Sequence, residues 1–260
     1  MASNRARAFL GWVLAAFLST GTLRAAEPPD PADLVREAND YWRGKTSYIA
    51  VEMTVHRPEW ERSLRMTGWT RGREDALIRF TAPAKDAGNA TLKVGPSMWI
   101  FTPKLNQVIK LPASMMAQSW MGSDFSYNDL AKSDQIVDEY VHTLIGTTET
   151  DGHMEYTVES IPKPNAPIVW GKQQLRIRDD FVLLEEAFYD QDMQLVKRLK
   201  ATMIGPLGGR PYPVIMRMTD LGEEDHWTEL HYQDAEFDLD LPDYLFTLSN
   251  LSNPRTWTKP

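Results

Sequence analysis

Alternation of apolar and polar side chains with a period of two residues governs most of this sequence. It is clearest in Ile49–Val55, Met154–Glu159 and Tyr212–Thr219. Side chains that alternate in this way lie on opposite faces of a strand, so each segment predicts a strand with one buried face. The other strand-like runs are Ser63–Arg71, Ala76–Phe80, Thr91–Val94, Met98–Phe101, Gln107–Leu111, Val137–Ile145, Val169–Ile177, Val182–Tyr189, Leu195–Met203 and Thr228–Gln233.

Short turn signals such as Asp151-Gly152 and Gly205–Gly209 separate these runs. Many short strands in antiparallel succession predict a strongly bent sheet or a barrel. No fixed internal period is present, which excludes a propeller. No linker-like change of composition divides the chain, so we expect one domain over residues 26–260.

One helix precedes the strands. Asp30 is a suitable N-cap, Pro31 suits the first helical position, and Gly44 supplies a stop. A second departure from the strand period is Leu111–Lys132, where Pro112 is expected to begin a short helix that stops at Gly122. Ser126 and Asp129 then form a capping-box start for another short turn. A helical insertion of this kind is expected to cover an open sheet face or a barrel mouth.

The N-terminus has the layout of a secretory signal peptide. Arg5 and Arg7 precede the apolar run Ala8–Leu18, and small residues lead to Ala25. The run is shorter than the roughly 20 residues of a membrane-spanning helix. We therefore expect residues 1–25 to be removed near Ala25/Ala26, leaving a soluble periplasmic protein with no lipid anchor, because no cysteine follows.

Composition excludes several classes of function. The formal charge of −8 argues against a nucleic-acid partner, and the absence of cysteine excludes disulfides, thiolate metal sites and cysteine nucleophiles. The five histidines are scattered, and His226 and His231 are expected on opposite faces of a strand. Ser160–Lys163 matches S-x-x-K only by chance, because Pro162 and the strand pattern deny it a helix start. We expect no metal, no cofactor and no catalytic constellation.

The sequence does offer a stretch rich in methionine and aromatic residues. Methionine is flexible and polarizable, and it recurs on surfaces that accept varied apolar partners. An ordinary core would use the same residue types, and composition alone does not separate the two interpretations. The candidate residues for an apolar cavity and its cover are Met98, Trp99, Phe101, Met115, Met116, Trp120, Met121, Phe125 and Tyr127.

Three segments resemble the LolA-like superfamily of periplasmic carriers. Gly68–Arg71 and Gly95–Pro103 are similar to its paired strands, and Ser119–Leu130 resembles the signature of the outer membrane lipoprotein-sorting protein group. The Gly122–Leu130 stretch is the most specific part. The resemblance implies a mainly β (α+β) fold, a half-open antiparallel β-barrel of about eleven strands that short helices close over an apolar cavity for acyl chains.

The resemblance also implies partners and a latch. A strand arginine holds the cover closed in such carriers, and Arg71 and Arg73 lie at the matching place. We expect this arginine to bond backbone carbonyls of the cover, or to pair with Asp124 or Asp129. A proline of the carrier pattern is missing here, so the choice between the two arginines stays open. The implied partners are lipid or lipoprotein acyl chains, an inner-membrane RND-type exporter and an outer-membrane acceptor. The alternatives are an envelope sensor that binds a lipid signal, or an enzyme on the same fold.

Overall fold

Thirteen antiparallel strands make one continuous sheet in the computed structural model, which describes residues 28–259. The sheet order is β6-β5-β4-β3-β2-β1-β13-β12-β11-β10-β9-β8-β7, so the first strand pairs with the last. The strands are β1 Thr46–Arg57, β2 Trp60–Arg71, β3 Asp75–Ala82, β4 Ala90–Val94, β5 Ser97–Thr102, β6 Gln107–Lys110, β7 Tyr140–Thr150, β8 His153–Pro162, β9 Lys172–Arg178, β10 Leu183–Tyr189, β11 Leu195–Leu207, β12 Arg210–Asp220 and β13 Trp227–Phe237.

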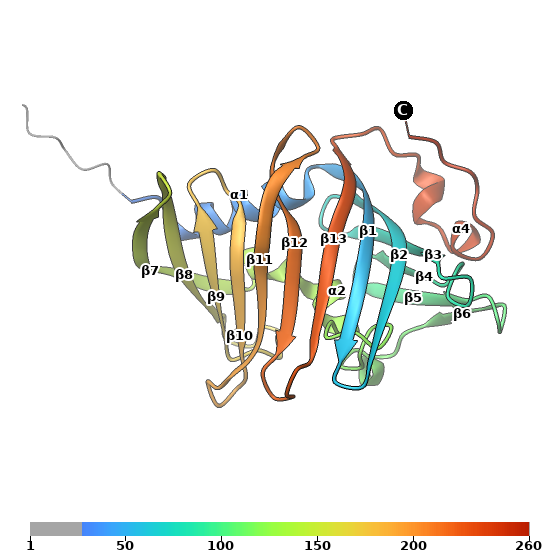
Figure 1. The fold of residues 1–260 in the computed structure, drawn as a ribbon, viewed down its shortest axis with the longest axis horizontal. Coiled ribbons are helices and arrows are strands. Elements are labelled where there is room, and N and C mark those ends of the chain that lie inside the picture. The colour runs from blue at the N-terminus through green and yellow to red at the C-terminus, as the bar shows by residue number, and fades with distance from the viewer. Residues whose placement is uncertain (1–27, 260) are drawn as a thin grey trace, which may run out of the picture.

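The sheet curls, and both of its ends turn toward the same side (Figure 1). Its two edge strands, β6 and β7, do not pair with each other, so the barrel is half open. The fold class expected from the sequence is confirmed, with thirteen strands where about eleven were expected. The strand-like run predicted at Gln107–Leu111 is present as β6, a four-residue edge strand whose side chains are all exposed.

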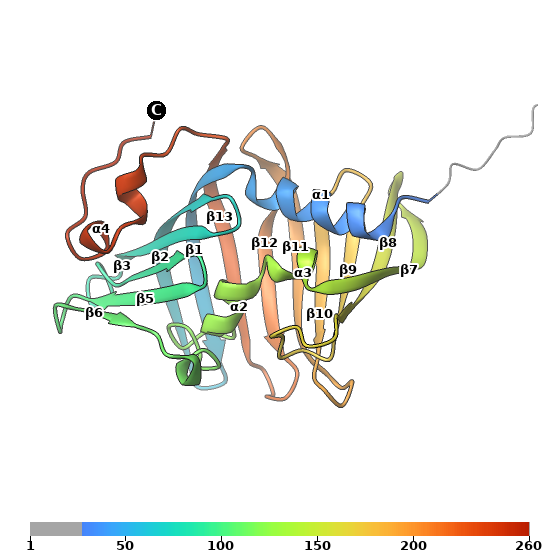
Figure 2. The same ribbon diagram turned by 180° about the vertical axis from the view of Figure 1, so that it is seen from behind.

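Helices cover the concave side of the sheet. Figure 2 shows α1 (Pro31–Arg43), α2 (Tyr127–Lys132) and α3 (Gln135–Asp138) in front of the strands. The caps that the sequence predicts for α1 are present: the Asp30 side chain accepts from the backbone of Ala32 and Asp33, and Gly44 ends the helix at a φ of 65°. The capping box of α2 is also present, formed by Ser126 and Asp129.

The apolar face of α1 fixes it to the sheet. Leu34, Val35 and Ala38 are buried against strands β7 and β9 and against Ile136 of α3. At its other end, Trp42 stacks on Tyr212, with ring centroids 5.0 Å apart. No helix among residues 28–259 is long and apolar enough to cross a membrane. The expected signal peptide lies outside the described residues.

A C-terminal segment packs on the sheet near β3–β6. It contains the 3-10 helix η2 (Asp243–Phe246) and α4 (Leu248–Ser252), at the end of the sheet opposite β7 (Figure 1). Leu241, Leu245 and Leu251 from this segment are buried in a cluster with Trp69 and Phe101 of the strands. Here the outer face of the sheet is therefore covered as well, and apolar side chains on that face are buried without facing the concave side.

Candidate functional site

The concave face of the sheet and its helical cover enclose an apolar cavity of about 220 Å³. Strands β1 to β3 and β13 contribute its floor, and the cover contributes Trp120, Phe125 and Leu130. Trp42 of α1 closes one side. The floor includes Ile49, Val51, Met66, Leu77, Ile78, Leu230 and Tyr232.

Two smaller cavities continue this space beneath the cover. One has a volume of about 120 Å³ and lies toward β9–β12, and the other has about 130 Å³ and lies beneath α1. Ser133, between α2 and α3, lines all three. The cavities therefore form a chain along the concave face rather than isolated packing defects.

The buried surface around this space is rich in methionine. Five methionines from four different strands are buried to 7% exposure or less: Met53, Met66, Met98, Met216 and Met218. Because an unbranched thioether side chain adapts its rotamers easily, such a wall can repack around occupants of different shape.

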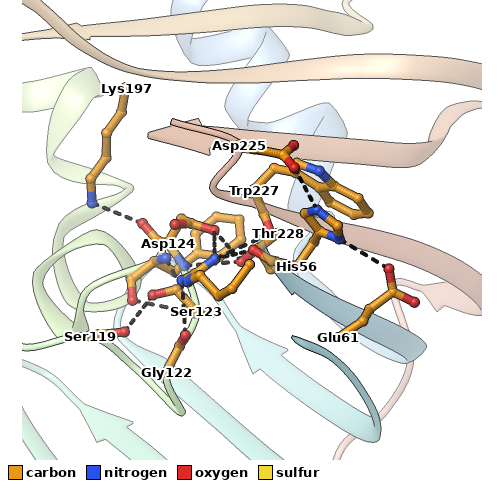
Figure 3. A network of polar contacts seen from close by, with 12 residues as sticks. His56, Glu61, Ser119, Gly122, Ser123, Asp124, Lys197, Asp225, Trp227 and Thr228 are labelled. Atoms are coloured by element: carbon orange, nitrogen blue, oxygen red, sulfur yellow. Dashed lines mark hydrogen bonds and ion pairs between the residues drawn. The ribbon is translucent and has the colours of Figure 1, made fainter. Parts of the chain in front are cut away.

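Polar contacts hold the cover down at Asp124, whose carboxylate is nearly inaccessible to solvent. Arg57 at the end of β1 donates to the Asp124 carboxylate at 3.1 Å and to the Gly122 carbonyl at 3.0 Å. Thr228 of β13 donates to the same carboxylate at 2.6 Å and accepts from the Asp124 amide at 3.0 Å (Figure 3). Bonds that involve charged groups are the strong ones, so this network fixes the loop to two central strands.

The backbone beside this network adopts an uncommon conformation. Met121 and Gly122 have φ values of 55° and 77°. A positive φ is uncommon for a residue with a side chain and is ordinary for glycine. The turn directs the Gly122 carbonyl toward Arg57, so the Asp124 network holds a local conformation that the Met121 backbone alone disfavours.

Two further carboxylates of the cover are paired with cations of the scaffold. Asp129 of α2 lies 3.4 Å from the Lys197 ammonium of β11, which also donates to the Asp124 carbonyl at 2.8 Å (Figure 3). Asp134 lies 2.8 Å from the Arg43 guanidinium and 3.8 Å from the Lys93 ammonium. Burial raises the pKa of Asp134, and the two cations oppose that rise.

Asp124, Asp129 and Asp134 therefore fasten one segment of cover to four scaffold cations. These three contacts are polar, whereas the surface between them is apolar. This arrangement suits a cover that separates from the sheet as a unit, because breaking a few ion pairs in the presence of water costs less than unfolding strands.

The structure brings some of the predicted cavity residues together and separates others. Met98, Trp120 and Phe125 line the main cavity. Trp99 and Phe101 do not: both pack in the cluster beneath the C-terminal segment. The prediction that they line the cavity is wrong, because alternation along β5 places Met98 on one face and its two aromatic neighbours on the other.

The remaining predicted residues belong to the cover rather than to the cavity wall. Met121 and Tyr127 pack against the central core cluster. Met115 and Met116 are half-buried beside a 3-10 turn, η1 (Ala113–Met115), where the sequence predicts a longer helix. Trp120 lies beyond that turn and donates from its indole nitrogen to Thr91 at 3.1 Å.

The expected latch by Arg71 or Arg73 is also wrong in its partners. Arg71 bonds Asp75 and Asp243, and Arg73 lies near Asp40 and Asp138. Strand register gives the reason. Arg71 pairs with Thr46 at one end of the β1–β2 hairpin, whereas Arg57 pairs with Trp60 at the other end. These ends are about 35 Å apart for strands of this length, and Asp124 lies at the Arg57 end.

Sequence reasoning missed Arg57, Lys197 and Glu186. The first two lie at places that only the three-dimensional fold reveals. Glu186 had a signal: Glu185 and Glu186 are consecutive in the predicted strand Val182–Tyr189. Two adjacent residues of a strand face opposite sides, so one of these carboxyls must point to the apolar face.

The one cluster among residues 28–259 with three candidate metal ligands is His153, Asp179 and Asp180. Its groups are already engaged. His153 and Asp179 share a hydrogen bond of 2.6 Å, and Asp179 accepts from the Met154 amide. Asp180 accepts two hydrogen bonds of 2.7 Å from Arg178, one from Nε and one from Nη2. These hydrogen bonds and the ion pair to Arg178 stabilise the turn of the β9–β10 hairpin.

Comparison with solved structures defines the class of fold. A DUF1329 family protein from Desulfovibrio piger has 26% sequence identity, a TM-score of 0.76, and covers 86% of this chain and 100% of its own. An outer membrane lipoprotein-sorting protein domain from Vibrio parahaemolyticus has 21% identity and a TM-score of 0.73, covering 85% and 98%. A LolA superfamily protein, NE2245, from Nitrosomonas europaea has 22% identity and a TM-score of 0.70, also covering 85% and 98%. The fold is LolA-like, and the resemblance seen in the sequence is confirmed.

A family model described as "Uncharacterized protein" matches residues 72–253, and the chain belongs to that family. The search of curated proteins found no match.

Proposed function

We propose that this protein is a periplasmic carrier that holds a lipid, a lipoprotein acyl chain or another hydrophobic molecule and passes it between envelope components. The observation that carries the proposal is the 220 Å³ cavity between the concave face and its cover, with apolar side chains from both. The lipoprotein-sorting name of the Vibrio parahaemolyticus relative supports the same kind of cargo.

Burial of hydrocarbon supplies the affinity. Each buried methylene contributes about 0.8 kcal/mol, so a ten-carbon chain gains about 8 kcal/mol, enough for micromolar binding before association costs are subtracted. The main cavity is smaller than the roughly 300–1,000 Å³ of ordinary ligand pockets. A larger cargo therefore needs the cover to move, and the ion pairs at Asp124, Asp129 and Asp134 set how readily it does so.

The N-terminal sequence and the fold support the proposed compartment. The basic and apolar layout of residues 1–25 supports export to the periplasm, and a fold shared with a LolA superfamily protein agrees with a role there. The proposed partners are an RND-type exporter of the inner membrane, which loads or receives the cargo, and an outer-membrane acceptor. The proposal assigns binding and transfer, and no chemical reaction.

Displacement of a neutral fluorescent dye, N-phenyl-1-naphthylamine, tests the proposal. The dye should bind the native protein, and phospholipid or a long-chain alcohol should displace it. Leu130→Asp should weaken dye binding at least about tenfold, because it puts a charge into the desolvated cavity wall. The control is Val141→Asp on β7, where the side chain is 57% exposed and a charge stays hydrated. A folded protein that binds neither dye nor lipid would contradict the proposal.

A further inference from the structure

Glu186 is a carboxyl group in the middle of the apolar concave face. It lies on β10, and its cross-strand neighbours are Leu175 of β9 and Leu199 of β11. The preceding residue, Glu185, faces the other way and is paired with Arg176 at 3.3 Å and Arg198 at 3.1 Å. Two adjacent glutamates therefore occupy opposite environments, one satisfied and one not.

Among residues 28–259 no hydrogen bond or ion pair reaches the Glu186 side chain. The half-buried side chain lines both of the smaller cavities. The carboxyl therefore lies in the space beneath the cover, next to the main cavity where we place the cargo. A half-buried carboxyl without a partner on an apolar face is costly, which makes this position unlike ordinary core.

The three cations near Glu186 are engaged with other partners. Lys197 binds the Asp124 carbonyl and Asp129, and Lys132 donates to the Pro167 carbonyl at 2.6 Å. Arg43 is paired with Asp134. The titratable or amide groups that line the same two cavities are Asn39, Arg43, Asn128, Asp129, Lys132, Asp134, Tyr140 and Gln173.

The surroundings favour the neutral form of Glu186. Burial, with a smaller contribution from the nearby Asp129 carboxylate, raises its pKa to about 8. A protonated carboxyl carries one O–H donor together with acceptor capacity. In the cavity it can bond a neutral hydroxyl or carbonyl of a bound molecule. An anionic headgroup would meet Asp129, and the three cations named above already have other partners.

We propose that Glu186 recognises the polar end of the cargo, and that this cargo is a hydrophobic molecule with a neutral hydrogen-bonding group such as an alcohol. This inference rests on the carrier function proposed above and specifies its substrate class. The apolar wall of the cavity supplies most of the affinity. Glu186 selects among molecules of equal chain length, because a ligand that cannot form a hydrogen bond with it leaves the carboxyl unpaired and binds more weakly.

Binding of 1-decanol, measured by displacement of the neutral dye at pH 7, tests the inference. Glu186→Leu should weaken decanol binding about tenfold while the dye binds as before, since the lost bond is worth about 1.4 kcal/mol. Glu186→Gln should keep decanol binding, because an amide both donates and accepts. Glu185→Gln, on the opposite face, is the matched control. If Glu186→Leu binds decanol as tightly as the native protein, Glu186 does not recognise the polar end of the cargo.

An infrared measurement makes the test independent of the apolar variant. The C=O stretch of the protonated Glu186 carboxyl should shift when decanol binds, and this band should be missing from Glu186→Gln. A band that decanol leaves unchanged would overturn the inference. Loss of dye binding in the native protein would instead overturn the carrier function itself, so the two failures are distinguishable.

Discussion

Glu186→Gln keeps the shape of the side chain and removes its ability to ionise. Comparing this variant with the native protein therefore measures how much the ionisation of Glu186 makes stability depend on pH. The carboxyl pKa is 4.5 for an unperturbed glutamate here and about 8 in the folded protein. Between these values the folded chain holds a proton that the unfolded chain has lost. Stability therefore falls as pH rises through this window and is constant again above it.

The size of the effect follows from the shift. One pKa unit corresponds to about 1.4 kcal/mol, so the full window amounts to at most about 5 kcal/mol of unfolding free energy. The glutamine variant lacks this loss. Its unfolding free energy minus that of the native protein should rise by about 1.4 kcal/mol per pH unit from about pH 5 to pH 8, then level off.

Urea unfolding followed by tryptophan fluorescence gives the required difference at each pH. Other titrating groups are shared by the two proteins and cancel in the subtraction. Glu185→Gln serves as control, since its carboxyl is paired with Arg176 and Arg198 on the other face; its difference should show no such rise. A flat difference for Glu186→Gln between pH 5 and 9 would refute the reasoning, because it would mean that the carboxyl ionises in its ordinary range.

Two further predictions concern the cover and the N-terminus. Arg57→Leu leaves the buried Asp124 carboxylate without its cation, so the free energy of opening residues 115–130 should fall by about 3 kcal/mol. Amide hydrogen exchange in these residues should become faster, and bound lipid should slow it. Arg217→Leu, which removes an ion pair to Glu229 on the outer face, should change this exchange by less than about 1 kcal/mol, and equal effects of the two variants would contradict the role of Arg57. The mature protein should begin at Ala26 by mass analysis of the periplasmic fraction, and an intact Met1 there would exclude the signal peptide.

Local signals in the sequence carried most of the fold. The period-two alternation of Ile49–Val55 predicted β1, and the caps at Asp30 and Gly44 predicted the bounds of α1. The capping box at Ser126 predicted the start of α2. These features depend on residues close together in the chain, so a single sequence is enough to find them.

The site depended on contacts between distant residues, and there prediction was weaker. Trp99 and Phe101 were placed in the cavity because alternation separates two faces without saying what covers each one. Only the fold shows that the C-terminal segment covers the face of the sheet that holds Trp99 and Phe101. The Asp124 network likewise depends on distant residues. Arg57 is 67 positions from Asp124 in the sequence and Thr228 is 104 positions from it, so no local pattern connects them.

The most direct test of the account is to identify what the protein carries. The protein should be purified from the periplasm without detergent, checked by native mass spectrometry, and extracted with organic solvent for lipid analysis. The account predicts a hydrophobic molecule at near-stoichiometric amount, displaced in Leu130→Asp and retained in Val141→Asp. A native protein that carries nothing and takes up no lipid when lipid is supplied would contradict it.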